Sequence, residues 1–176
     1  ISRIGLALEP WAELGTWVEQ ERLDALFLHR PWKLDMTSLS TDVGILSYHL
    51  AFDLHLTTGF NPRLAKALHM SQPTPFAFKG DIALGMWSDM QPTQISTIVA
   101  QLTDIFGSSP VIEQAFTDTI RSMAVVGAMT DALIREAAEQ GVQLYITGQY
   151  RQPARTAVHE TRMTVAAIGH MSSEQW

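Results

Sequence analysis

Short apolar runs alternate with amphipathic segments along this chain of 176 residues, and that alternation limits the fold more than any other feature. The runs have the length of buried strands, and the segments between them repeat apolar residues at the spacing of a helix. Strands that alternate with helices predict an α/β fold in which helices cover the faces of the sheet. We expect one compact unit over residues 1–176, or two lobes that meet near the proline-rich segment 72–75.

The predicted elements follow from these patterns and from the turn residues around them. The predicted strands are Ile4–Leu8, Leu23–Leu28, Val43–Tyr48, Pro110–Glu113, Ser122–Val126, Leu144–Thr147 and Met163–Ile168, with a hairpin over Phe76–Trp87 that turns at Lys79-Gly80-Asp81. One predicted helix follows Pro10. The other predicted helices cover Leu64–Leu68, Gln94–Phe106, Thr130–Gln140 and Pro153–Glu160. Thr130 is expected to cap one helix at its start, and Gly107 to end another.

Composition excludes several classes of protein. The chain has no cysteine, so it has no disulfide, no thiolate nucleophile and no cysteine-bearing metal site. Its net charge is −6 and its 12 basic residues are scattered, which argues against a broad nucleic-acid surface. Charged residues or prolines interrupt every apolar run well before the roughly 20 residues that a membrane span needs. We therefore expect no nucleic acid and no membrane as partners, and a cytoplasmic location.

Histidines stand at the ends of three predicted strands. His29, His49 and His170 each follow such a strand, and functional groups of α/β proteins gather where strands end. Asp53 follows His49 by four residues, and Glu174 follows His170 by four. If a helix begins at each place, this spacing puts both side chains on one helix face, where they can share an ion. Such a set suits zinc, iron, manganese or nickel.

Other interpretations remain open at this point. Each histidine also fits a hydrogen-bonded residue at the end of a strand. The amides of Val125–Met129, between a predicted strand and a helix, can receive an anion, although the segment lacks a phosphate-binding fingerprint. Thr147-Gly148 can be a simple turn. Serine hydrolysis is rejected because no Gly-x-Ser-x-Gly elbow is present.

Four segments together resemble the Nif-three-like family, whose bacterial members often carry the name GTP cyclohydrolase type two. Leu26–Trp32 resembles the His-His-Pro segment of that family, and Ser47–Asp53 resembles its segment with a histidine four residues before an aspartate. Gln143–Gly148 resembles its strand that ends in Thr-Gly, and Ile168–Glu174 resembles its terminal Gly-His-x-x-x-Glu. The order and rough spacing of all four segments agree, so the resemblance covers nearly the whole chain.

The resemblance implies a layered α-β-α protein with mixed sheets and helices packed on their faces. It also implies one or two divalent metal ions per chain and assembly as a ring-shaped homohexamer with the metal sites facing an internal cavity. Carried over residue by residue, the metal ligands are His29, His49, Asp53, His170 and Glu174.

Arg30 departs from the family pattern. It stands where the family has a second consecutive histidine, and a guanidinium carries a permanent charge and cannot ligate a metal. Five ligands therefore remain for a set of six, which puts a two-metal centre in question. Arg30 can pair with Asp53 or Glu174, bind an anionic group of a substrate, or point into solvent.

Two further departures concern a loop and the ends of the chain. After the Thr-Gly strand the family tends to have an acidic residue, a lysine and a histidine, whereas this chain has Gln149, Arg151 and Pro153. An acid–base role from that loop is therefore not carried over. The chain has no counterpart of the family's N-terminal helix and strand, or of the elements after its terminal glutamate. We therefore expect that the chain lacks terminal segments.

The candidate ligands and the resemblance together predict a metal-dependent hydrolase, and the resemblance implies that it acts on a nucleotide, a cyclic amide or an amidine. Glu174 or Asp53 is the expected proton acceptor, and Arg30 is expected to orient a small anionic substrate. The alternative is a non-catalytic assembly or regulatory protein that keeps a degraded or single-metal site. A third interpretation, an ordinary α/β domain whose histidines never meet, requires the resemblance to be coincidental.

Overall fold

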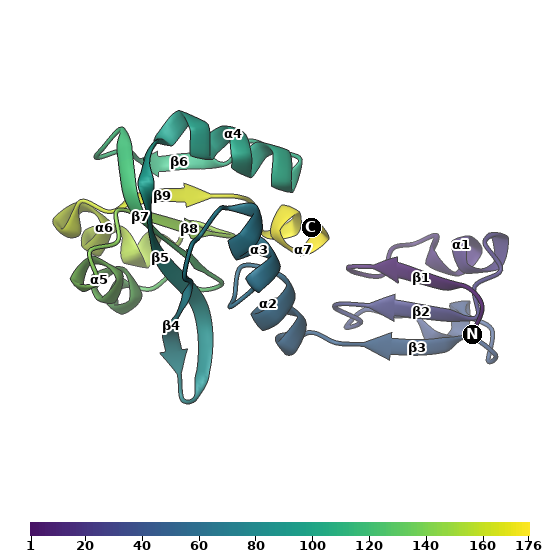
Figure 1. The fold of residues 1–176 in the computed structure, drawn as a ribbon. Helices are drawn as coiled ribbons and strands as arrows, with labels where there is room; N and C mark the ends of the chain where they lie inside the picture. The colour runs from purple at the N-terminus through teal and green to yellow at the C-terminus, as the bar shows by residue number, and fades with distance from the viewer. The chain divides into compact units, whose positions relative to one another are not determined.

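The computed structural model describes the backbone of residues 1–176 and every side chain except that of Gln114. Backbone contacts divide the chain into two compact units, Ile1–Phe52 and Asp53–Trp176. Each unit has a sheet of its own (Figure 1). The segment 72–75, where the sequence allowed two lobes to meet, lies inside the second unit. There Thr74 begins strand β4, which forms an edge of the sheet, where a proline such as Pro75 costs no ladder hydrogen bond.

The first unit is built on a three-stranded parallel sheet in the order β1-β2-β3. Its elements are β1 (Ile4–Ala7), α1 (Leu14–Gln20), β2 (Ala25–Leu28), the 3₁₀ helix η1 (Met36–Ser38) and β3 (Gly44–Ser47). Leu14 and Val18 of α1 are buried in one cluster with Leu26 and Leu28 of β2. Because side chains alternate along a strand, α1 covers the face of the sheet toward which these two leucines point.

The second unit is built on a six-stranded mixed sheet in the order β4-β5-β7-β8-β9-β6, in which β7, β8 and β9 are parallel. Its strands are β4 (Thr74–Lys79), β5 (Ile82–Gln94), β6 (Val111–Gln114), β7 (Thr119–Val126), β8 (Leu144–Thr147) and β9 (Thr164–Ala167). Its helices are α3 (Pro62–Ala67), α4 (Ile95–Phe106), α5 (Asp131–Glu139), η2 (Gln152–Ala154), α6 (Arg155–Thr161) and α7 (His170–Gln175). The boundary between the units falls inside α2 (Leu50–Leu56).

Helices cover both faces of the six-stranded sheet (Figure 1). Met123 and Val125 of β7 are buried in a cluster that also contains residues of α3 and α4. Their neighbours Ala124 and Val126 are buried in a second cluster, which contains residues of α5 and α6. The side chains of one strand thus serve two cores, as expected for a strand between two helical layers. The predicted α-β-α layering with a mixed sheet is confirmed in this unit.

The predicted turns and caps agree with the structure. Gly80 lies in the tight turn between β4 and β5 with φ of 61°, a conformation that glycine adopts without strain. Gly107 ends α4 in the left-handed conformation. The hydroxyl of Thr130 accepts a hydrogen bond from the Leu133 amide and so caps α5. The predicted helix Pro153–Glu160 is divided into η2 and α6, because Pro153 lies in the 3₁₀ turn that precedes the α-helix.

Most of the helices are short. The longest, α4, has 12 residues, and α1, α6 and α7 have seven, seven and six. None of the described helices has both the length and the apolar character to cross a membrane.

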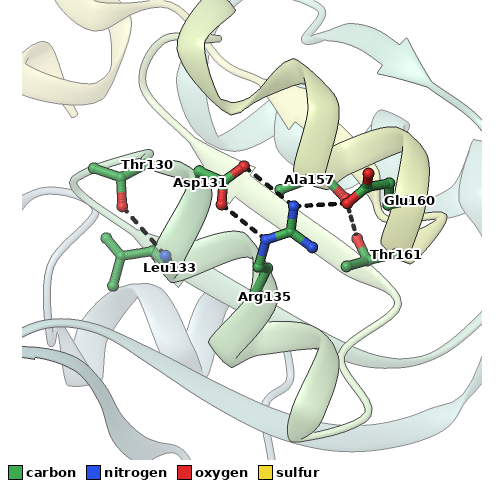
Figure 2. Close-up of polar contacts among 7 residues, drawn as sticks. All are labelled: Thr130, Asp131, Leu133, Arg135, Ala157, Glu160 and Thr161. Atoms are coloured by element: carbon green, nitrogen blue, oxygen red, sulfur yellow. Dashed lines mark hydrogen bonds and ion pairs between the residues drawn. The ribbon is translucent and has the colours of Figure 1, made fainter.

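An arginine joins α5 to α6 on the surface of the second unit (Figure 2). Nε of Arg135 donates to Asp131 one turn earlier at 2.8 Å, and an Nη atom donates to Glu160 of α6 at 2.7 Å. Both hydrogen bonds raise the pKa of Arg135, and the one to Asp131 has the larger effect. Because the three side chains are largely exposed, we expect their attraction to be weak and screened by salt.

We predict that Arg135→Gln lowers the melting temperature slightly in dilute buffer, because the link between α5 and α6 is lost. The difference from wild type should shrink as salt is raised from 0.1 M to 1 M, where the screening length falls from about 10 Å to about 3 Å. Scanning calorimetry at both salt concentrations measures the effect. Arg121→Gln is the control, since no ion pair of the exposed Arg121 side chain is found among the described residues; equal shifts for both variants would contradict the prediction.

Candidate metal centre and strand-end pocket

His29 and His49 follow neighbouring strands of the first unit. β2 and β3 are parallel, and their register pairs Leu28 with Ser47, so the chain leaves both strands at the same edge of the sheet. The two imidazole rings consequently lie with centroids 4.7 Å apart. His29 is fully buried. The sequence expectation that both histidines stand at strand ends is met, and the parallel register explains why they meet.

The protonation of His29 follows from its contact with Tyr48. Nδ1 of His29 lies 3.2 Å from the Tyr48 carbonyl oxygen, which can only accept a hydrogen bond. In a neutral imidazole Nδ1 therefore carries the proton, and Nε2 carries the lone pair that can ligate a metal. A backbone carbonyl that orients a ligating histidine in this way is a common feature of metal sites.

Asp53 joins the two histidines. α2 begins directly after His49, so the condition under which the spacing of four predicts a shared helix face is met. One ligand atom from each of His29, His49 and Asp53 lies within 4.8 Å of the other two. An ion that contacts ligand atoms at about 2.0–2.2 Å holds any two of them at most about 4.4 Å apart. Two imidazoles and one carboxylate at this spacing therefore fit a divalent metal ion after small side-chain rotations.

Aromatic rings surround the two histidines within the first unit. The ring of Phe52 lies 4.6 Å from that of His29, and the ring of Trp32 lies 5.0 Å from that of His49. Apolar rings exclude water, so electrostatic attraction between an ion and its ligands is stronger there than in solvent.

Arg30 has a partner that the sequence did not suggest. Its Nε lies 2.7 Å from a carboxylate oxygen of Glu9, and its side chain is mostly buried. β1 and β2 are parallel, and the Arg30 amide donates to the Leu8 carbonyl, which brings Glu9 beside Arg30. The guanidinium thus forms an ion pair within the first unit.

His170 and Glu174 form a second group, in the second unit. α7 begins at His170, so here too the spacing of four places both side chains on one helix face. Nε2 of His170 lies 3.2 Å from a carboxylate oxygen of Glu174, whose side chain is buried. Gly169 precedes the helix with φ of 92°, a conformation that allows α7 to start immediately after β9 and that other residues rarely adopt.

A pocket lies at the carboxyl ends of the parallel strands β7, β8 and β9. It has a volume of about 360 Å³, within the range of small-molecule sites. Asp53, His170 and Glu174 line it, together with Thr147 and Gly148 at the end of β8.

Several lining residues were not among the site residues predicted from the sequence. Four of them carry hydroxyl groups: Thr57, Thr58, Thr130 and Ser173. Thr57 lies one turn after Asp53, and its hydroxyl donates to the Asp53 carbonyl at 2.7 Å. The spacing of four between Asp53 and Thr57 is visible in the sequence, but isolated threonines and serines within or next to helices are too common to stand out.

A model of the family described as Duf34/NIF3 (NGG1p interacting factor 3) matches residues 28–176, which is most of the chain. The chain belongs to this family. The resemblance stated from four short segments is thereby confirmed.

Among curated NIF3 relatives are two proteins named GTP cyclohydrolase 1 type 2 homolog. That of Chlamydia trachomatis is 27% identical over 136 residues, covering 76% of this chain and 53% of the relative. That of Pseudomonas aeruginosa is 26% identical over 141 residues, covering 80% of this chain and 56% of the relative. The chain thus spans about half the length of the curated relatives that it matches.

Solved structures share the fold. Reduced HcgD from Methanocaldococcus jannaschii superposes with a TM-score of 0.76 at 20% identity, covering 99% of this chain and 75% of that one. A Bacillus cereus protein described as related to NIF3 superposes with a TM-score of 0.70 at 12% identity, covering 97% and 79%.

The loop in which this NIF3 chain departs from the family pattern lies in the wall of the pocket. Gln149 and Arg151 both line it, and the Arg151 amide donates to Sδ of Met129 at 3.3 Å. Tyr145, buried beneath the wall, donates from its hydroxyl to the Ala128 carbonyl at 2.6 Å. Burial raises the pKa of Tyr145 well above its ordinary value, so this hydroxyl keeps its proton at neutral pH. These two hydrogen bonds attach the segment between β7 and α5 to β8 and to the loop that follows it.

We predict that Tyr145→Phe destabilises the protein by about 1–3 kcal/mol, because the Ala128 carbonyl loses its hydrogen-bond donor while the ring stays in place. Urea denaturation measures the change. Tyr150→Phe is the matched control, since no hydrogen bond of the Tyr150 hydroxyl is found in the described structure, and it should leave stability nearly unchanged. Equal losses in the two variants would show that the Tyr145 hydrogen bond does not support this segment.

Proposed function

We propose that this chain is the metal-binding part of a NIF3-family hydrolase that uses a divalent metal ion to cleave a nucleotide, a cyclic amide or an amidine. The observation that carries the proposal is the close approach of ligand atoms from His29, His49 and Asp53. The names of the curated relatives, which refer to GTP cyclohydrolase, support the substrate class.

The roles of the side chains follow from their chemistry. When bound, a divalent ion lowers the pKa of a coordinated water from 15.7 toward about 7 and so provides a nucleophile near neutral pH. His29, His49 and Asp53 would hold the ion, and His170 and Glu174 are the further ligands that the resemblance implies. Glu174 or Asp53 would accept a proton from the attacking water. Arg30 would orient an anionic group of the substrate, with Glu9 holding its guanidinium in place.

The assembly and location are part of the same proposal. Zinc, iron, manganese and nickel all bind imidazoles and carboxylates. The proposal is therefore one or two ions per chain of any of these metals. A homohexamer in the cytoplasm is what membership of the family suggests for the whole protein.

We predict that the purified protein retains at least one divalent metal ion per chain and that His49→Ala loses most of it, because one of three ligands is removed. Inductively coupled plasma mass spectrometry after dialysis measures the metal content. His55→Ala is the control, since the exposed His55 lies on the same helix α2 but outside the ligand group. Equal metal content in wild type and in both variants would contradict the proposed centre.

The rival function is that of a non-catalytic assembly or regulatory protein with a single-metal site. Arg30 favours it, because it stands where the family has a second histidine and a guanidinium cannot ligate a metal. This candidate shares the metal site with the hydrolase and differs from it only in turnover.

Turnover assays separate the two functions. With the bound metal present, the hydrolase proposal predicts release of product from GTP or from a cyclic amide, and loss of that activity in His49→Ala in proportion to the lost metal. Assays with several divalent metals and chromatographic product analysis provide the measurement. A metal-loaded protein with no turnover on any of these substrates would favour the non-catalytic role.

A further inference from the structure

Two threonines that are almost fully buried as residues line the strand-end pocket. Thr58 and Thr147 are 3% and 2% exposed, and both line the pocket. Among the described residues, neither hydroxyl makes a hydrogen bond. Each hydroxyl can therefore donate to, and accept from, a ligand or an ordered water in the pocket.

The glycine at the end of β7 keeps the space beside one of these hydroxyls open. A Cβ atom added to Gly127 would lie 3.6 Å from Oγ1 of Thr58. Because glycine has no side chain, a ligand atom can approach Thr58 and the backbone of the segment between β7 and α5 at the same time.

Thr130 adds a third hydroxyl, whose proton is not used in a hydrogen bond within the described structure. Its oxygen accepts from the Leu133 amide at 3.2 Å, so its own proton remains available to a group in the pocket that it lines. Thr130 caps the nine-residue helix α5, whose amino-terminal end carries partial positive charge and favours an anion.

Arg151 brings a full positive charge to the same pocket. It lines the pocket, and its guanidinium forms no ion pair with any carboxylate among the described side chains, which are all but that of Gln114. The bond from its amide to Met129 fixes the backbone from which the side chain extends. A guanidinium matches the oxygens of a phosphate or carboxylate group with two parallel hydrogen bonds.

We propose that Thr58, Thr130, Thr147 and Arg151 bind a phosphoryl group of the substrate. Three hydroxyl groups and a guanidinium offer more hydrogen bonds than the two oxygens of a carboxylate can accept, whereas a phosphoryl group has three terminal oxygens. The pocket is much larger than a phosphate ion, so a phosphorylated organic molecule fits it.

The charged residues of the pocket favour one place for the phosphoryl group. Asp53 and Glu174 repel an anion and Arg151 attracts it, so the phosphoryl group is expected to lie beside the Arg151 guanidinium. This inference rests on the proposed function only in taking the bound molecule to be the substrate of the metal-dependent reaction.

The test is the binding of inorganic phosphate, GTP and guanosine to the full chain, measured by isothermal titration calorimetry with EDTA present so that no metal contributes. We expect saturable binding of phosphate and GTP, and much weaker binding of guanosine. Arg151→Gln should weaken phosphate and GTP binding about tenfold or more, because a charged hydrogen-bonding partner is lost. Arg155→Gln is the control: Arg155 is exposed, begins α6 and does not line the pocket, so this variant should bind as wild type does.

Thr58→Val and Thr147→Val test the hydroxyl groups with nearly unchanged shape, and each should weaken phosphate binding several-fold. Circular dichroism confirms that the variants are folded. The proposal is overturned if wild type shows no saturable phosphate binding, or if Arg151→Gln and Arg155→Gln have equal effects. Because the titrations exclude metal, the absence of phosphate binding refutes the phosphoryl site and leaves the proposed metal centre untouched. A chain that binds phosphate but fails to retain metal in the dialysis experiment instead refutes the metal-dependent hydrolase.

Discussion

The hydrogen-bonded pairing of parallel strands sets the position of every candidate functional group in this protein. In the first unit the pairing of β2 with β3 brings the chain out of the sheet at His29 and at Tyr48, one residue before His49. In the second unit β7, β8 and β9 end at one edge, and the loops that follow them form the pocket. A one-residue shift of register in either sheet would exchange the two faces of a strand and separate these groups. The buried clusters on both faces of the larger sheet oppose such a shift, because it would bring apolar side chains into water.

The pocket of the second unit combines groups of opposite charge. Carboxylates of Asp53 and Glu174 line it together with hydroxyl groups and the Arg151 guanidinium. Because the carboxylates repel an anionic group and the guanidinium attracts it, these charges favour one placement of the anionic end of a ligand. The Tyr145 hydroxyl donates to the Ala128 carbonyl and the Arg151 amide donates to Met129 Sδ, so both hydrogen bonds hold the segment between β7 and α5 in place.

Much of this arrangement could be predicted from local pattern, because strand ends, helix caps and the spacing of four residues depend on near neighbours. The helices that carry Asp53 and Glu174 are too short for an apolar repeat, so the sequence supported them only through the spacing from His49 and His170. The ion pair of Arg30 with Glu9 could not be predicted, because it depends on β1 lying beside β2. The same holds for the pocket threonines: Thr58 and Thr147 are 89 residues apart in the sequence (147 − 58) and line one cavity only because of the sheet order. Contacts between distant segments are a property of topology, which local pattern does not contain.

The central claim is that His29, His49 and Asp53 hold one metal ion. An anomalous-difference map recorded at the zinc absorption edge, from crystals of the full chain grown with zinc, tests it most directly. The account predicts a peak within about 2.0–2.2 Å of a ring nitrogen of each histidine and of an Asp53 carboxylate oxygen. Peaks confined to other positions, or no peak at zinc concentrations that saturate binding in solution, would contradict it.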